Sequence, residues 1–266
     1  MHNSCNHPWH RLINFIIYFD LALSLLSCSN DDNIQNEEKN NDSYLSIKEY
    51  LIAHRGLCNG VDAPENSRLA LKRALAQNIY GTEFDVRQTK DGKIVICHDE
   101  TFHGMIIEKS TYNELSTKLL SNGETIPLLE EFLEIRKNFN TSVKIVVDVK
   151  KCSIVDMIQQ ISKFGLENDV VFISFTKNYC QKLEKLGFGG NTFYSNNSTT
   201  PDEIKKMGLV GVCYKSTFFE KSLYYYEAAR ALGIQIMVWT ENDPLRIKDY
   251  SSKNIYVITD NLSDYN

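Results

Sequence analysis

Short apolar runs alternate with amphipathic helical patterns along the chain from about residue 44 onward. The runs have the length and β-branched content of buried strands, whereas the segments between them place apolar side chains at helical spacing. Candidate strands lie at residues 50–54, 80–86, 93–97, 143–149, 170–174, 191–194, 209–214, 234–239 and 255–259. Candidate helices lie at residues 67–78, 127–136, 154–164, 178–186, 201–207, 222–232 and 244–250. This alternation predicts an α/β protein with a parallel sheet.

The number of strands favours a closed barrel over an open sheet. The candidate strands occupy roughly 220 residues, which suits a (β/α)8 TIM barrel with one strand left over. We expect residues 93–97 to be the strand outside the barrel, because only an Asp91-Gly92 turn separates them from residues 80–86. Residues 100–124 are less regular, and Thr111-x-x-Glu114 predicts a capping box that opens one helix there.

The first 45 residues have a different pattern. Residues 12–26 are largely apolar, follow Arg11 and end at Ser27-Cys28, which is typical of an export signal. Because Leu25-Leu26-Ser27-Cys28 resembles a bacterial lipobox, we expect a lipoprotein-type signal peptide at 1–28 with Cys28 lipidated. A flexible polar linker at 29–45 and a barrel domain at 46–266 would follow. The protein would then be exported to the periplasm or cell envelope and touch the membrane only through this anchor. The alternative is an amphipathic or buried N-terminal helix.

Composition excludes several classes of function. The chain has 266 residues and a formal net charge of −5, and no basic run interrupts it, so nucleic acid is not an expected partner. The five cysteines beyond residue 45 contain no Cys-x-x-Cys pair, which argues against a zinc site or a disulfide framework. We expect most of them to be small buried side chains.

Titratable side chains gather where the expected strands end, which is where (β/α)8 barrels carry their catalytic groups. These ends hold His54 and Arg55, Glu83 and Asp85, and Asp148 and Lys150. Residues two apart on a strand share a face, so three carboxylates would repel one another at the barrel mouth without a cation between them. Oxygen ligands of this kind suit Ca²⁺ or Mg²⁺. We therefore expect Glu83, Asp85 and Asp148 to bind a divalent cation, the alternative being ordinary surface ion pairs.

Two histidines lie close to these acids in the predicted fold. A hairpin around Asp91-Gly92 would make Glu83 and His98 cross-strand neighbours, while His54 arrives from the first strand. Two histidines at one site suggest a general base paired with a general acid; the alternative is a purely structural role for each. Arg55 and Lys150 could bind a phosphate, or could only neutralise the acids.

These motifs, taken in order, resemble the glycerophosphodiester phosphodiesterase family from about residue 50 to residue 261. The resemblance rests on His54-Arg55-Gly56, Pro64-Glu65-Asn66-Ser67, Glu83-Phe84-Asp85-Val86, Thr89-Lys90-Asp91-Gly92, His98-Asp99, Ile126-Pro127, Leu129-Glu130-Glu131, Asp148-Val149-Lys150, Ser174-Phe175, Trp239-Thr240-Glu241-Asn242 and Thr259-Asp260-Asn261. The family implies a (β/α)8 barrel that uses a divalent cation, Ca²⁺ or Mg²⁺, to hydrolyse glycerophosphodiesters to glycerol 3-phosphate and an alcohol.

Site roles follow from the same resemblance. It implies that His54 and His98 form the acid–base pair and that Arg55 and Lys150 contact phosphate. The metal ligands would be Glu83, Asp85 and Asp148, Trp239 would line the glycerol side, and Glu65 would border the site. Asp148 departs from the pattern, because the family usually has Glu there, and its carboxylate is one methylene shorter.

Two other functions stay open at this stage. The same barrel could act as a phospholipase C or D on intact or lyso-phospholipid, or it could bind phosphodiesters as a lipoprotein without catalysis. The sequence does not indicate which alcohol forms the head group or which histidine is the base.

Overall fold

The computed structural model describes residues 47–262 and residue 265. The expected signal peptide, 1–28, and linker, 29–45, lie outside the described residues. Among the helices that are described, none is long and apolar enough to cross a membrane.

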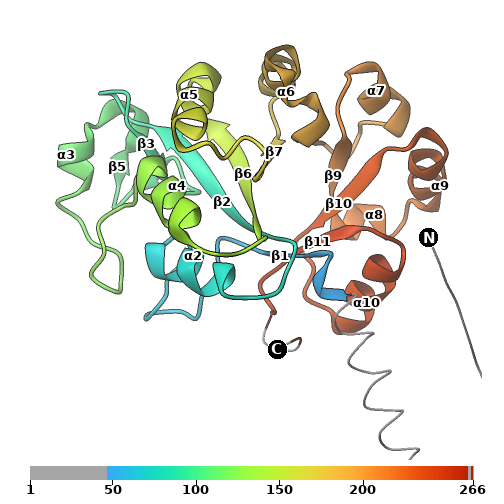
Figure 1. Cartoon of the computed structure of the whole chain (residues 1–266), viewed down its shortest axis with the longest axis horizontal. Coiled ribbons are helices and arrows are strands. Elements are labelled where there is room, and N and C mark those ends of the chain that lie inside the picture. The colour runs from blue at the N-terminus through green and yellow to red at the C-terminus, as the bar shows by residue number, and fades with distance from the viewer. Residues whose placement is uncertain (1–46, 263–264, 266) are drawn as a thin grey trace, which may run out of the picture. The chain divides into compact units, whose positions relative to one another are not determined.

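Eight parallel strands close into a barrel within the described part of the chain (Figure 1). Around the ring they are β1 (Leu51–Ala53), β2 (Gly81–Gln88), β6 (Lys144–Lys151), β7 (Val170–Ser174), β8 (Thr192–Ser195), β9 (Gly211–Lys215), β10 (Gln235–Trp239) and β11 (Tyr256–Thr259). The ring is closed because β1 pairs in parallel with both β2 and β11. The predicted (β/α)8 barrel is therefore confirmed.

Helices link successive strands and lie around the outside of the ring. They are α2 (Arg68–Leu75), α4 (Leu129–Asn138), α5 (Ile154–Phe164), α6 (Lys177–Leu183), η2 (Glu184–Phe188), η3 (Gly189–Asn191), α7 (Pro201–Lys206), α8 (Ser216–Phe219), α9 (Leu223–Leu232) and α10 (Pro244–Ser252). Local signals set their ends. The Ser67 hydroxyl accepts a hydrogen bond from the Ala70 backbone N–H at the start of α2, and Gly165 ends α5 in the left-handed region.

The ninth strand lies outside the barrel, as predicted. β3 (Ile94–Ile96) pairs antiparallel with the end of β2, and a small insertion follows it. The insertion holds β4 (Thr101–Phe102), β5 (Met105–Ile106), η1 (Ile107–Lys109) and α3 (Tyr112–Leu115). The predicted capping box of Thr111 and Glu114 opens α3, whereas the β4–β5 hairpin was not expected.

The predicted cross-strand pair of Glu83 and His98 is wrong. β2 and β3 pair Val86 with Ile96, and the Cys97 backbone N–H donates to the Asp85 carbonyl oxygen. This register places Cys97 opposite Asp85, and β3 ends before His98. His98 reaches the same cavity as Glu83 from the segment that follows the hairpin.

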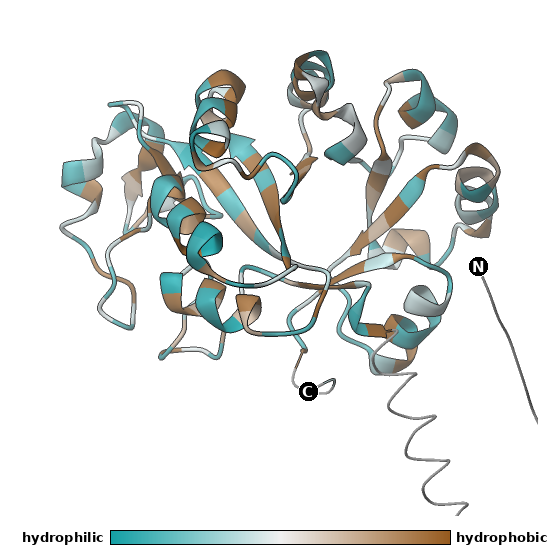
Figure 2. Cartoon of the chain, viewed as in Figure 1, coloured by the Kyte–Doolittle hydropathy of each residue, from teal (hydrophilic) through white to brown (hydrophobic). Residues whose placement is uncertain are grey.

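Alternation along the strands divides the core into two layers. One face of each strand packs against the helices; on β6 this face carries Val147 and Val149. The other face points into the barrel and carries Val146. Figure 2 shows the resulting alternation of hydrophobic and hydrophilic residues along β2 and β6. Asp148 and Lys150 lie on the same inward face of β6 as Val146, because alternate residues of a strand share a face. The apolar layer inside the barrel is therefore followed directly by charged groups.

Candidate active site

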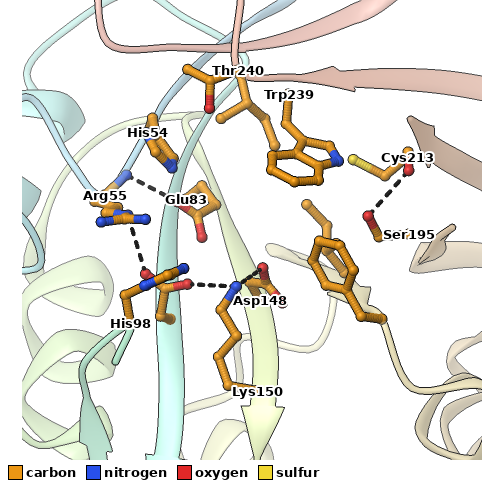
Figure 3. A pocket seen from close by; sticks show the side chains of 14 residues that line it. His54, Arg55, Glu83, His98, Asp148, Lys150, Ser195, Cys213, Trp239 and Thr240 are labelled. Atoms are coloured by element: carbon orange, nitrogen blue, oxygen red, sulfur yellow. Dashed lines mark hydrogen bonds and ion pairs between the residues drawn. The ribbon is translucent and has the colours of Figure 1, made fainter. Parts of the chain in front are cut away.

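A cavity opens at the C-terminal ends of the barrel strands, lined by charged groups on one side and aromatic ones on the other (Figure 3). Its walls are formed by His54, Arg55, Glu83, Asp85, His98, Asp148, Lys150, Ile173, Phe175, Ser195, Cys213, Trp239, Thr240 and Ile258. Of the residues expected at the site, only Glu65 is absent from this lining. It lies at the rim, where its Oε2 accepts a hydrogen bond from Arg55 Nη1 at 2.7 Å.

Three buried carboxylates gather on β2 and β6. Glu83, Asp85 and Asp148 each offer an oxygen, and these atoms lie within 4.8 Å of one another. Burial, together with repulsion from Asp85 and Asp148, raises the pKa of Glu83 well above its usual value. Burial likewise raises the pKa of Asp148 to about 6, although Lys150 opposes the shift. The cluster therefore favours positive charge between its members.

Two cationic side chains, Lys150 and Arg55, neutralise part of the negative charge of this cluster. Lys150 Nζ lies 2.6 Å from Asp148 Oδ2 and 3.2 Å from Asp85 Oδ1. Arg55 Nε lies 3.6 Å from Asp85 Oδ2, and the Arg55 backbone N–H donates to Glu83 Oε2 at 2.9 Å. Burial lowers the pKa of the Lys150 ammonium, but Asp148 and Asp85 more than compensate and leave it raised. Both side chains remain charged.

The donor set fits a divalent cation. Asp148 Oδ1 is buried and makes no hydrogen bond with any described residue, although it belongs to a three-carboxylate cluster. An unpartnered carboxylate oxygen is costly in a protein interior, and a hard cation such as Ca²⁺ or Mg²⁺ prefers such oxygens. Asp148 reaches the cluster despite its short side chain. The three residues predicted as metal ligands therefore lie close enough together to hold one cation.

The loop after β1 turns sharply to place its charged groups. Arg55 and Asn66 have positive φ angles of 55° and 59°, which non-glycine residues rarely adopt. Gly56 is also left-handed, and a Cβ there would lie 2.7 Å from the Ala70 Cβ. Asn66 Nδ2 donates to Asp85 Oδ2 at 2.8 Å, and the Asn66 backbone N–H bonds the Arg55 carbonyl. This loop therefore ties Arg55 to the carboxylate cluster.

His54 is held by residues from the far end of the chain. Its Nδ1 lies 2.6 Å from Asp260 Oδ1, and Asn242 Nδ2 donates to the other oxygen, Oδ2, at 2.9 Å. The hydrogen bond with His54 lowers the pKa of Asp260. With Nδ1 engaged, Nε2 is the nitrogen available to a ligand in the cavity. Asp260 and Asn242 belong to two of the motifs that carry the family resemblance, but no role and no contact between them was predicted from the sequence.

His98 is held by local contacts. Its Nδ1 lies 2.8 Å from Oδ1 of the next residue, Asp99, and its carbonyl oxygen accepts a hydrogen bond from Arg87 Nε. Figure 3 shows His54 above and His98 below the Arg55 side chain. The two imidazoles therefore flank the guanidinium and the carboxylate cluster.

Aromatic side chains form the opposite wall. The rings of Phe175 and Trp239 meet edge to face at 5.4 Å, and Lys150 Nζ lies 5.2 Å from the Phe175 ring centroid. Trp239 Nε1 is buried and has no hydrogen-bond partner among the described residues. The two rings give this side of the cavity an apolar surface, which suits the carbon skeleton of a small polyol.

Comparisons with known proteins agree with this geometry. The model of the glycerophosphoryl diester phosphodiesterase family matches residues 54–263. A glycerophosphodiester phosphodiesterase from Bacillus altitudinis is 31% identical over 153 residues, which cover 51% of this chain and 62% of that protein. One from Caldanaerobacter subterraneus is 31% identical over 156 residues, which cover 53% of this chain and 63% of the relative. The matches thus span less than two thirds of these relatives.

Solved structures extend the similarity over most of the fold. A glycerophosphodiester phosphodiesterase from Parabacteroides distasonis superposes with a TM-score of 0.76 at 27% identity, covering 82% of this chain and 95% of that one. An Oleispira antarctica phosphodiesterase in complex with the product sn-glycerol-3-phosphate gives a TM-score of 0.71 at 22% identity, covering 82% of this chain and 95% of that one, and indicates a shared fold. Because the family model covers most of the sequence and its motifs form one cavity, this chain belongs to the glycerophosphoryl diester phosphodiesterase family.

Proposed function

We propose that this protein hydrolyses glycerophosphodiesters to glycerol 3-phosphate and an alcohol with the help of a divalent cation. The observation that carries the proposal is the meeting of two aspartate-bound histidines, two cations and three buried carboxylates in one cavity. Such a cavity can bind a phosphodiester and can both accept and donate a proton. Membership of the family supports the same substrate class.

Arg55 and Lys150 would bind the phosphoryl oxygens, Arg55 through its guanidinium and Lys150 as a point charge. One histidine would take a proton from water or from the glycerol 2-hydroxyl, and the other would protonate the departing alcohol oxygen. Asp260 and Asp99 hold Nδ1 of each imidazole, which leaves Nε2 for these transfers. Trp239 and Phe175 would line the glycerol side, and Glu65 would keep Arg55 in place.

Glu83, Asp85 and Asp148 would bind Ca²⁺ or Mg²⁺ as carboxylate ligands. When bound, such a cation offsets negative charge on the phosphoryl group. Lys150 already contacts two of the three carboxylates, so its ammonium would share the cluster with the cation.

The test is release of glycerol 3-phosphate by purified protein from glycerophosphocholine and glycerophosphoethanolamine. We expect activity that EDTA abolishes and that Ca²⁺ or Mg²⁺ restores. Thermal unfolding supplies a second readout, because the bound cation should raise Tm in the wild type and not in Glu83→Gln. Hydrolysis that survives EDTA, His54→Ala and His98→Ala alike would refute the mechanism.

Two rival functions are separated by the same assays. A phospholipase C or D would turn over intact or lyso-phospholipid faster than the deacylated diester. A non-catalytic binding lipoprotein would bind the diester in calorimetry without releasing product. The many charged groups in the cavity lining favour the deacylated substrate over one that carries an acyl chain.

The resemblance of Leu25-Leu26-Ser27-Cys28 to a lipobox supports a further proposal, which concerns location. We propose export to the periplasm or cell envelope with a lipid anchor on Cys28. Expression in a bacterial host with labelled palmitate should label the wild type and not Cys28→Ala; label retained in the variant would disprove the anchor.

A further inference from the structure

A second hollow adjoins the candidate active site and shares His98 with it. It lies between the loop before α2 and the segment that follows β3, and it encloses about 260 Å³. Its lining consists of Pro64, Glu65, Asn66, Ile96, Cys97, His98, Asp99, Thr101, Phe102, His103 and Leu120. Nothing in the proposed chemistry so far uses this space.

A phosphodiester has two ester arms, and only one of them is glycerol. With phosphate at Arg55 and Lys150 and the glycerol arm against Trp239, the second arm must leave the phosphorus in another direction. Among the described residues, His98 alone lines both hollows, and it shares the active-site cavity with Arg55 and Lys150. An alcohol whose oxygen lies at His98 would carry its remaining atoms into the second hollow.

The two hollows differ in their cations. The lining of the active-site cavity combines Arg55 and Lys150 with three carboxylates, whereas the lining of the second hollow contains acidic side chains and no lysine or arginine. Its acidic side chains are Glu65 and Asp99, which are 56% and 75% exposed. The hydrogen bond with His98 lowers the pKa of Asp99, so this carboxylate is ionised at neutral pH.

Glu65 and Asp99 each use only one carboxylate oxygen in these contacts. Glu65 bonds Arg55 through Oε2, and Asp99 contacts His98 through Oδ1. Glu65 Oε1 and Asp99 Oδ2 make no hydrogen bond with any described residue, and both side chains line the hollow. Phe102 and Leu120 add an apolar wall that suits methyl groups.

We propose that the second hollow is the subsite for the departing alcohol and that it selects a positively charged head group, an amino alcohol or a quaternary ammonium alcohol. The inference rests on the proposed function, which supplies the reaction. It adds a preference that the reaction alone does not require: a cationic head group placed between Glu65 and Asp99 while the phosphate contacts Arg55 and Lys150. His98 then protonates the alcohol oxygen as its bond to phosphorus breaks.

Thr101 offers a clean test, because it is exposed, lines the second hollow and pairs only with Ile106 in the β4–β5 hairpin. Thr101→Lys adds a positive charge to the hollow, Thr101→Glu adds a negative one, and Thr101→Gln is the uncharged control of similar size. The measurement is kcat/KM, by release of glycerol 3-phosphate, for glycerophosphocholine and glycerophosphoethanolamine against the uncharged glycerophosphoglycerol and glycerophosphoinositol.

We expect the wild type to favour the cationic head groups by about tenfold at low salt, since one or two carboxylates act at short range in a solvated hollow. Thr101→Lys should lower this ratio by about threefold, Thr101→Glu should raise it by about as much, and Thr101→Gln should leave it unchanged. The ratio should also fall as salt is added.

Each remaining outcome counts against the proposal. Equal turnover of charged and uncharged head groups, or a ratio that the Lys and Glu variants leave unchanged while glycerol 3-phosphate is still released, would overturn the subsite and leave the proposed function standing. Failure to release glycerol 3-phosphate from any of the four diesters would overturn the proposed function and this inference with it.

Discussion

The two histidines of the candidate site are held in contrasting ways. His54 directly follows strand β1 and contacts Asp260, which is 206 positions away in the sequence, whereas His98 follows the strand outside the barrel and contacts its own neighbour, Asp99. The His54 side chain is 21% exposed and that of His98 is 38% exposed. Asn242 secures the second oxygen of Asp260, and no described residue does so for Asp99.

This difference links each histidine to a different part of the fold. β1 pairs with β11, and the His54 backbone N–H donates to the Thr259 carbonyl oxygen, so closure of the barrel itself brings His54 to Asp260. His98 depends on the β2–β3 hairpin and on Arg87, which bonds its carbonyl oxygen. The position of His54 thus depends on the barrel itself, and the position of His98 depends on the β2–β3 hairpin that extends from it.

Removing either imidazole should have the largest effect. We expect His54→Ala and His98→Ala each to lower kcat about 10²- to 10⁴-fold, the usual contribution of a positioned acid or base. A p-nitrophenyl glycerophosphodiester separates the two roles, because its leaving group needs little protonation. His98→Ala should regain most of its activity on that ester and His54→Ala should not. Equal recovery in both variants would reverse or remove the assignment, and circular dichroism serves as the folding control.

Two glycines with left-handed backbone conformation allow the packing of the segments next to the two histidines to be compared. At Gly56, near His54, a Cβ would meet the Ala70 Cβ at 2.7 Å, whereas at Gly104, in the insertion after His98, it would meet nothing within 4 Å. Gly56→Ala should lower the free energy of unfolding by about 3 kcal/mol, from strain and overpacking together, and Gly104→Ala by about 1 kcal/mol from strain alone. Urea unfolding measures both. Similar losses would show that the loop after β1 is less tightly packed than its geometry indicates.

Replacing the aspartate that contacts His54 should lower kcat more than replacing the one that contacts His98. Asp260→Asn is expected to lower kcat about 10- to 100-fold, because a fixed carboxylate orients the imidazole and stabilises its charged form. Asp99→Asn should lower it less than about fivefold, since that pair is exposed and water can replace it. The pH profile of kcat/KM should move further in Asp260→Asn. A larger loss in Asp99→Asn would contradict the view that barrel closure gives the stronger support.

The smallest expected effect is on the free energy of unfolding at acidic pH. Contact with His54 lowers the pKa of Asp260, and contact with His98 lowers that of Asp99. A carboxyl whose folded pKa is lowered stabilises the protein above its unfolded pKa, near 3.9, and this stabilisation is lost as pH falls through the folded pKa. The stability gap between wild type and Asp260→Asn should therefore shrink below about pH 4, by less than about 1 kcal/mol. A gap that widens on acidification would contradict the sign.

The sequence alone predicted the barrel and placed most of the expected site residues at the ends of its strands. Apolar runs of strand length separated by amphipathic helices predict a parallel sheet, and the missing helix between residues 86 and 94 identifies β3 as the extra strand. The period of two in a strand brings Glu83 with Asp85, and Asp148 with Lys150, onto the inward face. These features follow from local periodicity, which a sequence displays directly.

Only the tertiary structure decided which groups contact one another. The register of the β2–β3 hairpin places Asp85, and not Glu83, opposite the end of β3, because pairing depends on the turn and on side-chain packing at once. The contact between His54 and Asp260 arises where the first and last strands close the ring, and no local pattern encodes a separation of that length. The second hollow beside His98 is likewise formed by two segments that meet only in the folded chain. Local chemistry is thus legible in the sequence, while the contacts between distant segments are set by closure of the barrel.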